Sequence, residues 1–444
     1  MNFKRQIALP VDAQTLFDWH ARPGALQRLL PPWDRVDLVD SVGELPDRRL
    51  TMRMHMGLLK ILWVAQHDGY IHGKQFRDSQ ERGPFASWIH THLTEPQGAG
   101  SLLTDSIDYE LPLAPFGRIA NPFIVARLNR MFEFRHQRTA EDLARHAGTT
   151  PKRIAVTGAT GLIGTQLCAF LETGGHRVDR LVRKDPKPGE IRWDPARRSI
   201  DVKALDGVDA VVHLAGENVG DRWTPERKKN VLQSRIDGTH TIADAVAQLD
   251  KKPLLLSASA VGYYGDTGDT EADESAPNGK GFLAEVCKAW EESADPARKA
   301  GVRVVHPRIG VILSGAGGAL GQMRTPFSMG VGGPMGSGKQ WMPWMAMDDA
   351  VGALHFLLDA GLEGPVNVVT EPVRQADFAR ALGKALGRPA FLPVPGFAVR
   401  TLFGEMGQGV LLEGQRAVPR RLREAGFKWL RTDLVEALRF ELGT

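Results

Sequence analysis

Hydrophobic positions recur with two different periods along the chain, and the change falls near residue 150. Before it, apolar and polar residues alternate in Leu50–Met56 and in Ser106–Leu111. A period of two indicates half-buried antiparallel strands. Asp12–His20 and the longer stretch Asn121–Ala147 have helical spacing instead. The first part is therefore predicted to combine several antiparallel strands with a short early helix and a long final one.

The second part has short, uninterrupted apolar runs separated by helical stretches. Arg153–Val156 leads into a glycine-rich turn at Thr157–Gly164, a helix over Thr165–Glu172 and a second strand over Arg177–Val182. Runs of this kind are typical of strands buried on both faces of a parallel sheet. Further predicted strands are Asp209–Gly216, Leu254–Val261 and Val302–Leu313, and further predicted helices are Phe378–Leu386 and Val394–Phe403.

The breakers around Gly148–Lys152 predict a linker between the two parts. We predict an α+β domain over residues 1–147, a doubly wound parallel α/β domain of Rossmann type over 153–370, and a small substrate-side domain over 371–444. Residues 314–347 are rich in glycine and show no hydrophobic period, so they are predicted to form a long loop that covers the cleft.

The composition of the chain argues against a disordered, a membrane-spanning or a secreted protein. The chain has 444 residues, 42% of them hydrophobic, and a net charge of +4, which fits folded domains rather than a disordered chain. No apolar stretch reaches the roughly 18 residues of a membrane span, and the first residues have no signal-peptide pattern. The two cysteines are far apart, so no metal site is predicted, and a cytoplasmic location is expected. No basic run interleaved with aromatic residues suggests nucleic acid as a partner.

The turn at residues 157–164 carries the most specific chemistry. Gly158 would permit the sharp turn, Gly161 would let the backbone approach a pyrophosphate, and Gly164 would let helix and strand pack closely. The N–H groups that begin the following helix would face the phosphates. This context predicts a dinucleotide site.

The end of the second strand predicts which dinucleotide binds. An NAD site usually has an acidic residue there, which accepts hydrogen bonds from the ribose 2′-hydroxyl. This chain has Arg183 and Lys184 instead, and cations suit a 2′-phosphate. NADP(H) is therefore the predicted cofactor, and the alternative is that the two residues form a solvated pair at a strand end.

Several phrases of the second part resemble the short-chain dehydrogenase/reductase superfamily, in its extended or atypical branch, and more narrowly its epimerase proteins. They are His213–Asn218, Ser234–Thr239, Ser259–Gly265, Phe282–Cys287 and Gly330–Trp341. The strand-tip turn ending at Gly216 could pass beneath a nicotinamide ribose. The resemblance implies cofactor contacts from Thr160, Gly161, Leu162, Ile163, Arg183, Leu214, Ala215 and Arg235, although Arg235 could also be an ordinary helix arginine.

The element order of the first part resembles the helix-grip domain of the START-like (SRPBCC) superfamily. The phrases Tyr109–Leu113 and Met131–His136 contribute to this resemblance. It implies a cavity between sheet and helix that could take an apolar ligand. The alternative is that the methionine and tryptophan side chains simply fill a core.

The sequence departs from the superfamily in its catalytic residues. The usual machinery is a serine with Tyr-x-x-x-Lys, in which the tyrosine moves the proton. Ser259 lies where the serine is expected, but Leu283 and Cys287 lie at the tyrosine and lysine positions, and Lys288 is one residue out of register. Our hypothesis makes Tyr264 the acid and Glu217 the base or substrate anchor. A hydrogen-bonded packing role for the tyrosine is the alternative.

Two functions follow from these observations. The first is an NADP(H)-binding reductase or nucleoside-diphosphate-sugar epimerase that acts on an unidentified small molecule, with Lys339, Gln340 and Trp341 of the glycine-rich segment as substrate clamps. The second is a non-catalytic protein that senses NADP(H) or binds a ligand. The missing tyrosine and lysine favour the second, and the glycine turn is compatible with both. The sequence does not indicate an oligomeric state.

Overall fold

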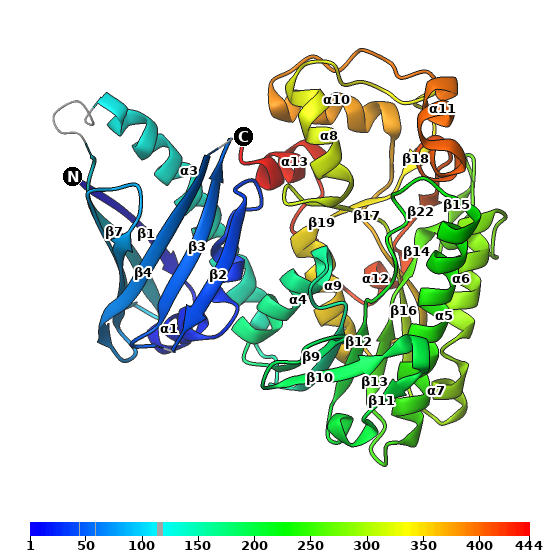
Figure 1. Ribbon diagram of the computed structural model, residues 1–444, viewed down its shortest axis with the longest axis horizontal. Helices are drawn as coiled ribbons and strands as arrows, with labels where there is room; N and C mark the ends of the chain where they lie inside the picture. Colours follow the sequence, from blue (N-terminus) through cyan, green and yellow to red (C-terminus); the bar gives the residue numbers. More distant parts are fainter. Residues whose placement is uncertain (44, 58, 113–118) are drawn as a thin grey trace. The chain divides into compact units, whose positions relative to one another are not determined.

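The computed structural model describes residues 1–43, 45–57, 59–112 and 119–444, and Figure 1 shows the course of the chain. The chain divides into two compact units. The first comprises Met1–Thr150 with the short segments Glu172–Gly175 and Gly443, and the second comprises Pro151–Leu171, His176–Leu442 and Thr444. Leu113, the last residue of one phrase quoted above, lies outside the described residues.

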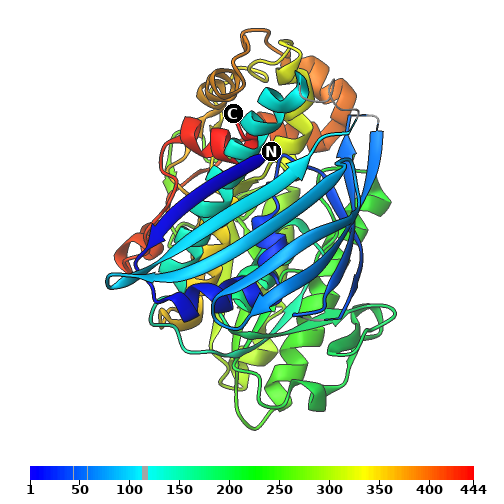
Figure 2. The same cartoon turned by 90° about the vertical axis from the view of Figure 1, so that its left-hand side faces the viewer.

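The first unit is built on a seven-stranded antiparallel sheet, in the order β1-β7-β6-β5-β4-β3-β2. Figure 2 shows the long strands of this sheet. Its strands are β1 (Asn2–Leu9), β2 (Val36–Val42), β3 (Arg49–Met56), β4 (Leu59–Ile71), β5 (Gln75–Arg82), β6 (Ser87–Gln97) and β7 (Gly100–Glu110). Its helices are α1 (Ala13–Ala21), α2 (Ala25–Leu29) and α3 (Asn121–His146).

Two of the local patterns predicted for this unit, the capped early helix and the alternation on β7, are confirmed. The alternation predicted for Leu50–Met56 is present only in part, because Leu50 is buried while Met56 is exposed. The Asp12 side chain caps α1 by accepting a hydrogen bond of 2.8 Å from the Thr15 backbone N–H. On β7, Ile107 and Tyr109 are buried while Asp108 between them is exposed. Phe132 of α3 packs in the same apolar cluster as Ile107 and Tyr109, so the long helix covers the inner face of the sheet.

The second unit contains a sheet in the order β11-β10-β9-β8-β12-β13-β16, with β14 and β20 both paired to β16. Its strands from β10 to β20 are parallel, and only the short β11 runs antiparallel. The strands are β8 (Arg153–Thr157), β9 (Arg177–Val182), β10 (Glu190–Asp194), β11 (Ser199–Ile200), β12 (Ala210–His213), β13 (Leu254–Ser257), β14 (Ser259–Ala260), β16 (Val304–Ile309) and β20 (Gly364–Val368).

This order reverses at β8, because the chain first proceeds outward to β9 and β10 and then returns to β12 on the other side. In open parallel sheets, ligands bind beyond the carboxyl ends of the strands at such a switch point. The predicted Rossmann-type α/β fold is thus confirmed, and its strand order predicts a ligand site at the carboxyl ends of β8 and β12.

Alternate residues of the central strand face opposite helix layers. Ile154 and Val156 lie in a cluster with α4 (Leu162–Thr173) and α9 (Met347–Asp359), whereas Ala155 lies in a cluster with α5 (Pro225–Gln248) and α7 (Asp295–Lys299). The sheet is therefore buried on both faces, which explains why its strands read as continuous apolar runs. A further helix, α6 (Phe282–Glu292), packs near α5.

Two of the strands predicted as single runs are each divided. Leu254–Val261 forms β13 and then β14, and a 3₁₀ turn begins at Val261. Val302–Leu313 forms β16 and then β17 (Val311–Leu313), which pairs with a different partner. The break falls at Gly310, where a β-carbon would lie 2.6 Å from the Pro343 carbonyl oxygen, so the chain changes sheets where another backbone segment approaches.

The prediction of a long loop over residues 314–347 is wrong. The segment contains the helix α8 (Gly318–Ser328) and two short strands, β18 (Trp341–Met342) and β19 (Trp344–Ala346). Leu320 and Phe327 of α8 are buried in one cluster with Trp344. These apolar positions have helical spacing, but the surrounding glycines and Pro326 conceal it in the sequence.

The C-terminal residues complete the second unit. Residues 371–442 belong to the same compact unit as the sheet, so the predicted boundary at residue 370 does not separate two units. The remaining elements are β15 (Glu271–Ala272), β21 (Val373–Arg374), α10 (Gln375–Leu386), α11 (Gly396–Met406), β22 (Arg416–Ala417), α12 (Arg420–Glu424) and α13 (Leu434–Leu442). Within the described part of the chain, no helix is both long enough and apolar enough to cross a membrane.

Candidate functional site

The glycine turn joins β8 to α4 with very close backbone contacts. Gly158 has a φ of 68°, and a β-carbon there would lie 2.9 Å from the Ala215 nitrogen. A β-carbon at Gly164 would lie 2.1 Å from the Gly158 carbonyl oxygen. At Gly161 the same test meets only that oxygen, at 3.2 Å. Gly158 thus lets the segment after β12 approach the turn, Gly164 lets α4 pack against the end of β8, and Gly161 leaves space at the helix start.

The end of β12 is fixed to the end of β8 by one hydroxyl group. Thr157 Oγ1 accepts hydrogen bonds from the Leu214 and Ala215 backbone N–H groups, at 3.1 and 3.2 Å. The same hydroxyl lies 2.7 Å from Nδ1 of the buried His213. Burial lowers the pKa of His213 to about 3, so the ring is neutral and acts as a packed strand residue.

Arg235 supports the loop that follows β12. It lies on α5, is only 9% exposed, and stacks over Trp290 with its guanidinium carbon 4.7 Å from the ring centre. Its guanidinium donates to the carbonyl oxygens of Glu217 and Val231, each at 3.0 Å. A β-carbon at Gly216 would lie 3.3 Å from that guanidinium carbon. Arg235 therefore holds the backbone of residues 216 and 217 in place.

Arg183 and Lys184 lie at the carboxyl end of β9, next to the strand that carries the glycine turn. Both side chains are exposed. Among the described residues, no hydrogen bond or ion pair engages either of them. Because neither side chain is paired with another described residue, both positive charges at this end of the sheet are available to bind an anionic ligand.

Ser259 and Tyr264 belong to one buried network that also contains a charged pair. Ser259 Oγ donates to the Glu291 carboxylate at 2.7 Å. The Arg308 guanidinium binds both oxygens of Glu291, at 2.8 and 2.9 Å, and donates to the Tyr264 hydroxyl at 2.9 Å. Ser259 and Tyr264 are thus connected through Arg308 and Glu291.

The Tyr264 hydroxyl is fully used within this network. It donates to Asn367 Oδ1 at 2.7 Å, and the side chain is 4% exposed. Burial raises the pKa of Tyr264 to about 12. For Arg308, burial alone would lower the pKa, but the Glu291 carboxylate raises it above its usual value. The bonds observed at Tyr264 are those of a packed, hydrogen-bonded side chain.

The positions that usually hold the catalytic tyrosine and lysine are apolar here. Leu283 and Cys287 lie on one side of α6 and face Gly262, where a β-carbon would be 3.2 Å from Leu283 and 3.8 Å from the Cys287 sulfur. Burial raises the pKa of Cys287 to about 11. Lys288 is exposed and forms an ion pair of 2.7 Å with Glu292, which confirms that it turns away from the site.

Among the described residues, no hydrogen bond joins Glu217, the proposed base, to the network around Tyr264. Its carboxylate forms an ion pair of 2.6 Å with Arg227, and that arginine also binds Asp221. The backbone N–H of Glu217 donates to Ser234 Oγ at 3.1 Å. The carboxylate is 40% exposed, so it remains open to solvent at the tip of β12.

The predicted substrate clamp makes contacts within the protein. The Gln340 amide donates to the carbonyl oxygens of Met335 and Leu411, at 3.0 and 2.8 Å. Two guanidinium groups lie within cation–π distance of Trp341, those of Arg374 at 3.9 Å and Arg416 at 4.8 Å from its ring centre. Lys339 is exposed. Gln340 and Trp341 therefore fix the segment, and Lys339 keeps a side chain in solvent.

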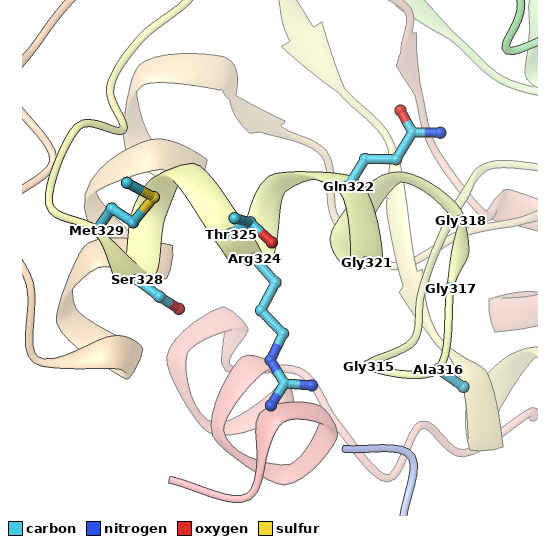
Figure 3. A pocket seen from close by; sticks show the side chains of 10 residues that line it. All are labelled: Gly315, Ala316, Gly317, Gly318, Gly321, Gln322, Arg324, Thr325, Ser328 and Met329. Atoms are coloured by element: carbon cyan, nitrogen blue, oxygen red, sulfur yellow. The ribbon is translucent and has the colours of Figure 1, made fainter. Parts of the chain in front are cut away.

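The segment before α8 reaches the start of the dinucleotide turn. A β-carbon at Gly317 or Gly318 would lie 3.6 or 3.1 Å from the Leu162 side chain, which begins α4. A hollow of about 620 Å³ opens beside this loop and α8. Figure 3 shows Arg324 and Ser328 projecting from the same side of α8, and Gln322 from the other. The glycine-rich segment thus borders the candidate cofactor site.

Sequence reasoning missed the residues that hold the site together. Arg308, Glu291 and Asn367 were not singled out, although an arginine inside the apolar run of β16 is a visible signal of a buried charge that needs a partner. A second hollow, of about 110 Å³, lies beside Leu283 and is bordered by Trp223, Glu405 and Gln408. Nothing in the local sequence pattern brings residues 223, 283 and 405 together.

The strand order, the glycine turn and the contacts between β8 and β12 define a dinucleotide-binding protein of Rossmann type. Residues 154–369 match the NAD-dependent epimerase/dehydratase family, and residues 394–441 match a domain of unknown function. An epimerase family protein of Mycobacterium bovis is 44% identical over 289 residues, which are 64% of this chain and 96% of that protein. The human epimerase family protein SDR39U1 is 38% identical over 65% of this chain and 98% of its own length. This chain belongs to the NAD-dependent epimerase/dehydratase family.

Solved structures extend the likeness. A crystal structure described as the nucleoside-diphosphate sugar epimerase of Corynebacterium glutamicum superimposes with a TM-score of 0.83 at 35% identity, over 99% of this chain and 90% of that one. The human SDR39U1 structure (isoform 2), which was solved with NADPH, has a TM-score of 0.60 at 37% identity over 65% of this chain and 99% of that one. The predicted resemblance to epimerase proteins is confirmed, and the START-like assignment of the first part stays a prediction.

Proposed function

We propose that the second unit binds NADP(H) in preference to NAD(H). The observation that carries this proposal is the combination of the glycine turn with two unengaged cations, Arg183 and Lys184, at the end of the neighbouring strand. A 2′-phosphate is dianionic or nearly so, and a guanidinium can bind it through two parallel hydrogen bonds. The human relative solved with NADPH supports the same choice.

Each part of the cofactor has a matching segment in this proposal. The N–H groups of residues 160–163 would face the pyrophosphate, with the dipole of α4 assisting. Arg183 and Lys184 would bind the 2′-phosphate. The backbone of residues 214–216, supported by Arg235, would lie beneath the nicotinamide ribose.

We further propose that the chain acts on a small molecule as an atypical reductase or nucleoside-diphosphate-sugar epimerase. When bound, the cofactor supplies the hydride chemistry. In this hypothesis Tyr264 is the acid, Glu217 is the base or the substrate anchor, and Ser259 takes the place of the usual catalytic serine. The likeness to the Corynebacterium glutamicum protein supports a nucleotide-sugar substrate, and the hollow beside α8 offers space for a ligand.

A specific set of contacts favours a second candidate, a non-catalytic protein that binds NADP(H) and senses its redox state. Leu283 and Cys287 replace the residues that usually move the proton. The Tyr264 hydroxyl already donates to Asn367, so a proton transfer from it would first break a buried hydrogen bond.

For the first unit we retain the proposal of a START-like helix-grip domain that takes an apolar ligand, on the basis of its antiparallel sheet covered by α3.

Nucleotide titrations test the cofactor proposal. Dissociation constants for NADPH and NADH would be measured with the full chain, with Arg183→Asp, and with Arg197→Asp as a control. Arg197 is exposed and carries the same charge. Loss of a charge-assisted contact costs about 1.5–3 kcal/mol, or roughly 10- to 100-fold in affinity, so NADPH binding should weaken by that factor only in the Arg183 variant. Equal binding of NADPH and NADH by the unmodified chain would refute the preference.

Hydride transfer separates the two functions. NADPH oxidation would be screened with carbonyl and enone substrates, and with NADP⁺ bound, conversion of nucleotide-sugar substrates into their epimers would be followed by separating the two stereoisomers. Turnover that Tyr264→Phe abolishes, while NADPH binding is retained, supports the enzyme and its proposed acid. Saturable NADPH binding without turnover across all three classes supports the sensor.

A further inference from the structure

A cluster of histidine and aspartate side chains lies on the inner face of the first unit's sheet, and the nucleotide site belongs to the other unit. His90 and His92 alternate on β6, so both point to the same face. In the sheet register Asp78 of β5 lies opposite His90, and Asp105 of β7 lies opposite His92. Both histidines and Asp105 are buried, with exposed fractions of 4%, 6% and 2%.

We propose that Asp78, His90 and His92 bind one divalent transition-metal ion of the zinc type. Each residue offers one ligand atom, and the three atoms lie within 4.8 Å of one another. His92 Nε2 is 3.3 Å and His90 Nδ1 is 3.8 Å from Asp78 Oδ2. Ligands at about 2.0–2.1 Å from a tetrahedral Zn²⁺ are themselves about 3.4 Å apart, so small side-chain adjustments bring the three atoms to coordination distance.

The second nitrogens of both rings lie near Asp105, and that of His90 is hydrogen-bonded to it. His90 Nε2 is 3.0 Å and His92 Nδ1 is 2.8 Å from Asp105 Oδ1. Metal-bound histidines usually direct their other ring N–H to a carboxylate, which fixes the tautomer. Asp105 is hydrogen-bonded to His90 and, at 2.6 Å, to His136 Nε2 of α3, whereas its contact with His92 Nδ1 is short but lacks hydrogen-bond geometry.

The arrangement of ring nitrogens and carboxylates also suits a cation. Both nitrogens of His90 and both of His92 face carboxylate oxygens, whereas a neutral imidazole has only one N–H. Without a metal, a lone pair on each ring faces Asp78 unless that ring takes a second proton. The ring centres are 3.9 Å apart, so two imidazolium charges would repel.

The ligand set indicates the class of metal. Two imidazoles with one carboxylate suit borderline ions such as Zn²⁺, Co²⁺ and Fe²⁺ better than Mg²⁺ or Ca²⁺. His67 Nε2, 2.8 Å from Asp78 Oδ1, steadies the carboxylate from its other side. The Asp78 side chain is 25% exposed, which gives an ion a route into the site. The sequence prediction of no metal ligand considered cysteines only, and it overlooked the His-x-His pair on one strand.

Cobalt and zinc titrations of the full chain test this proposal. The protein would be stripped with a chelator and titrated with Co²⁺, whose visible absorption reports coordination by nitrogen and oxygen, and then with Zn²⁺. We expect one equivalent to bind and Zn²⁺ to displace Co²⁺. His92→Gln and Asp78→Asn should lose this saturable binding. His55→Gln is the matched control, because His55 pairs with Asp37 at 2.7 Å in the same unit but outside the cluster.

Asp105→Asn keeps all three ligands and changes only the group that orients them. It should still bind Co²⁺, but about 10- to 100-fold more weakly. Circular dichroism of each variant shows whether the sheet is intact. If the unmodified chain takes up no metal, or if His92→Gln binds Co²⁺ as tightly as His55→Gln does, the metal site is refuted and the cluster is a proton-sharing network.

Discussion

Replacing Gly164 by alanine tests the packing on which the nucleotide site depends. An added β-carbon would lie 2.1 Å from the Gly158 carbonyl oxygen, 2.9 Å from its carbonyl carbon and 3.0 Å from the Ala159 α-carbon. All three are backbone atoms, so no flexible side chain can move aside. An ordinary contact is about 3.5 Å, so strand end and helix must separate by more than about 1 Å.

The magnitude follows from two opposing effects. Overpacking typically costs about 1–3 kcal/mol, and sometimes more. Alanine favours a helix over glycine by about 1 kcal/mol, and Gly164 lies inside α4 with no positive φ. Because β8 is held by hydrogen bonds to β9 and β12 on both sides, the strand yields little, and the upper part of the range applies. We expect a net loss of about 2 kcal/mol in the free energy of unfolding.

Gly161→Ala is the matched control within the same turn. Its β-carbon would meet only one atom, at 3.2 Å, so we expect unfolding stability within about 0.5 kcal/mol of the unmodified chain. Urea unfolding followed by circular dichroism measures both variants, and the transition of the second unit is the one compared. NADPH affinity should fall in both, because Gly161 faces the predicted pyrophosphate. Equal stability of Gly164→Ala and Gly161→Ala would refute the close-packing argument.

Three further changes test other contacts. Glu291→Gln leaves the buried Arg308 without its counter-charge and should lower the free energy of unfolding in urea by about 3–5 kcal/mol. Glu292→Gln alters an exposed pair and should change that free energy by about 0.5 kcal/mol or less. Equal effects of the two variants would contradict the role given to the buried pair of Arg308 and Glu291. Tyr264→Phe should cost about 1–3 kcal/mol, because Asn367 Oδ1 loses its buried donor, and an unchanged urea midpoint would show that the bond contributes nothing. Burial lowers the pKa of His213 to about 3 and that of His306 to about 4, so as the pH falls the unfolded chain takes up these protons before the folded chain does. The second unit should therefore lose stability as the pH falls from about 6.5 towards 4. His213→Gln should reduce this dependence of the free energy of unfolding on pH, and an unchanged dependence would place the proton uptake elsewhere.

The central strand and its turn could be predicted from the sequence because their requirements are local. A buried apolar run, three spaced glycines and a following helix are contiguous, so residues 153–182 folded as predicted. The out-of-register Lys288 was likewise predictable, because helical geometry alone decides which way it faces.

The remaining features depend on contacts between distant residues. Arg308 and Glu291 find each other across the fold, and Asn367 reaches Tyr264 from a separate strand. α8 was missed because its apolar residues cover a cluster formed with Trp344 and Phe378, while its glycines resemble a loop. The histidine cluster of the first unit was missed for the same reason, since four strands and a helix contribute to it.

A crystal structure of the full chain grown with excess NADPH tests the central claim most directly. The account predicts that the pyrophosphate lies against the N–H groups of residues 160–163 and that the 2′-phosphate is within hydrogen-bond distance of the Arg183 guanidinium. NADPH bound with its 2′-phosphate directed away from Arg183 and Lys184, or a crevice at the ends of β8 and β12 that stays empty at saturating NADPH, would contradict it.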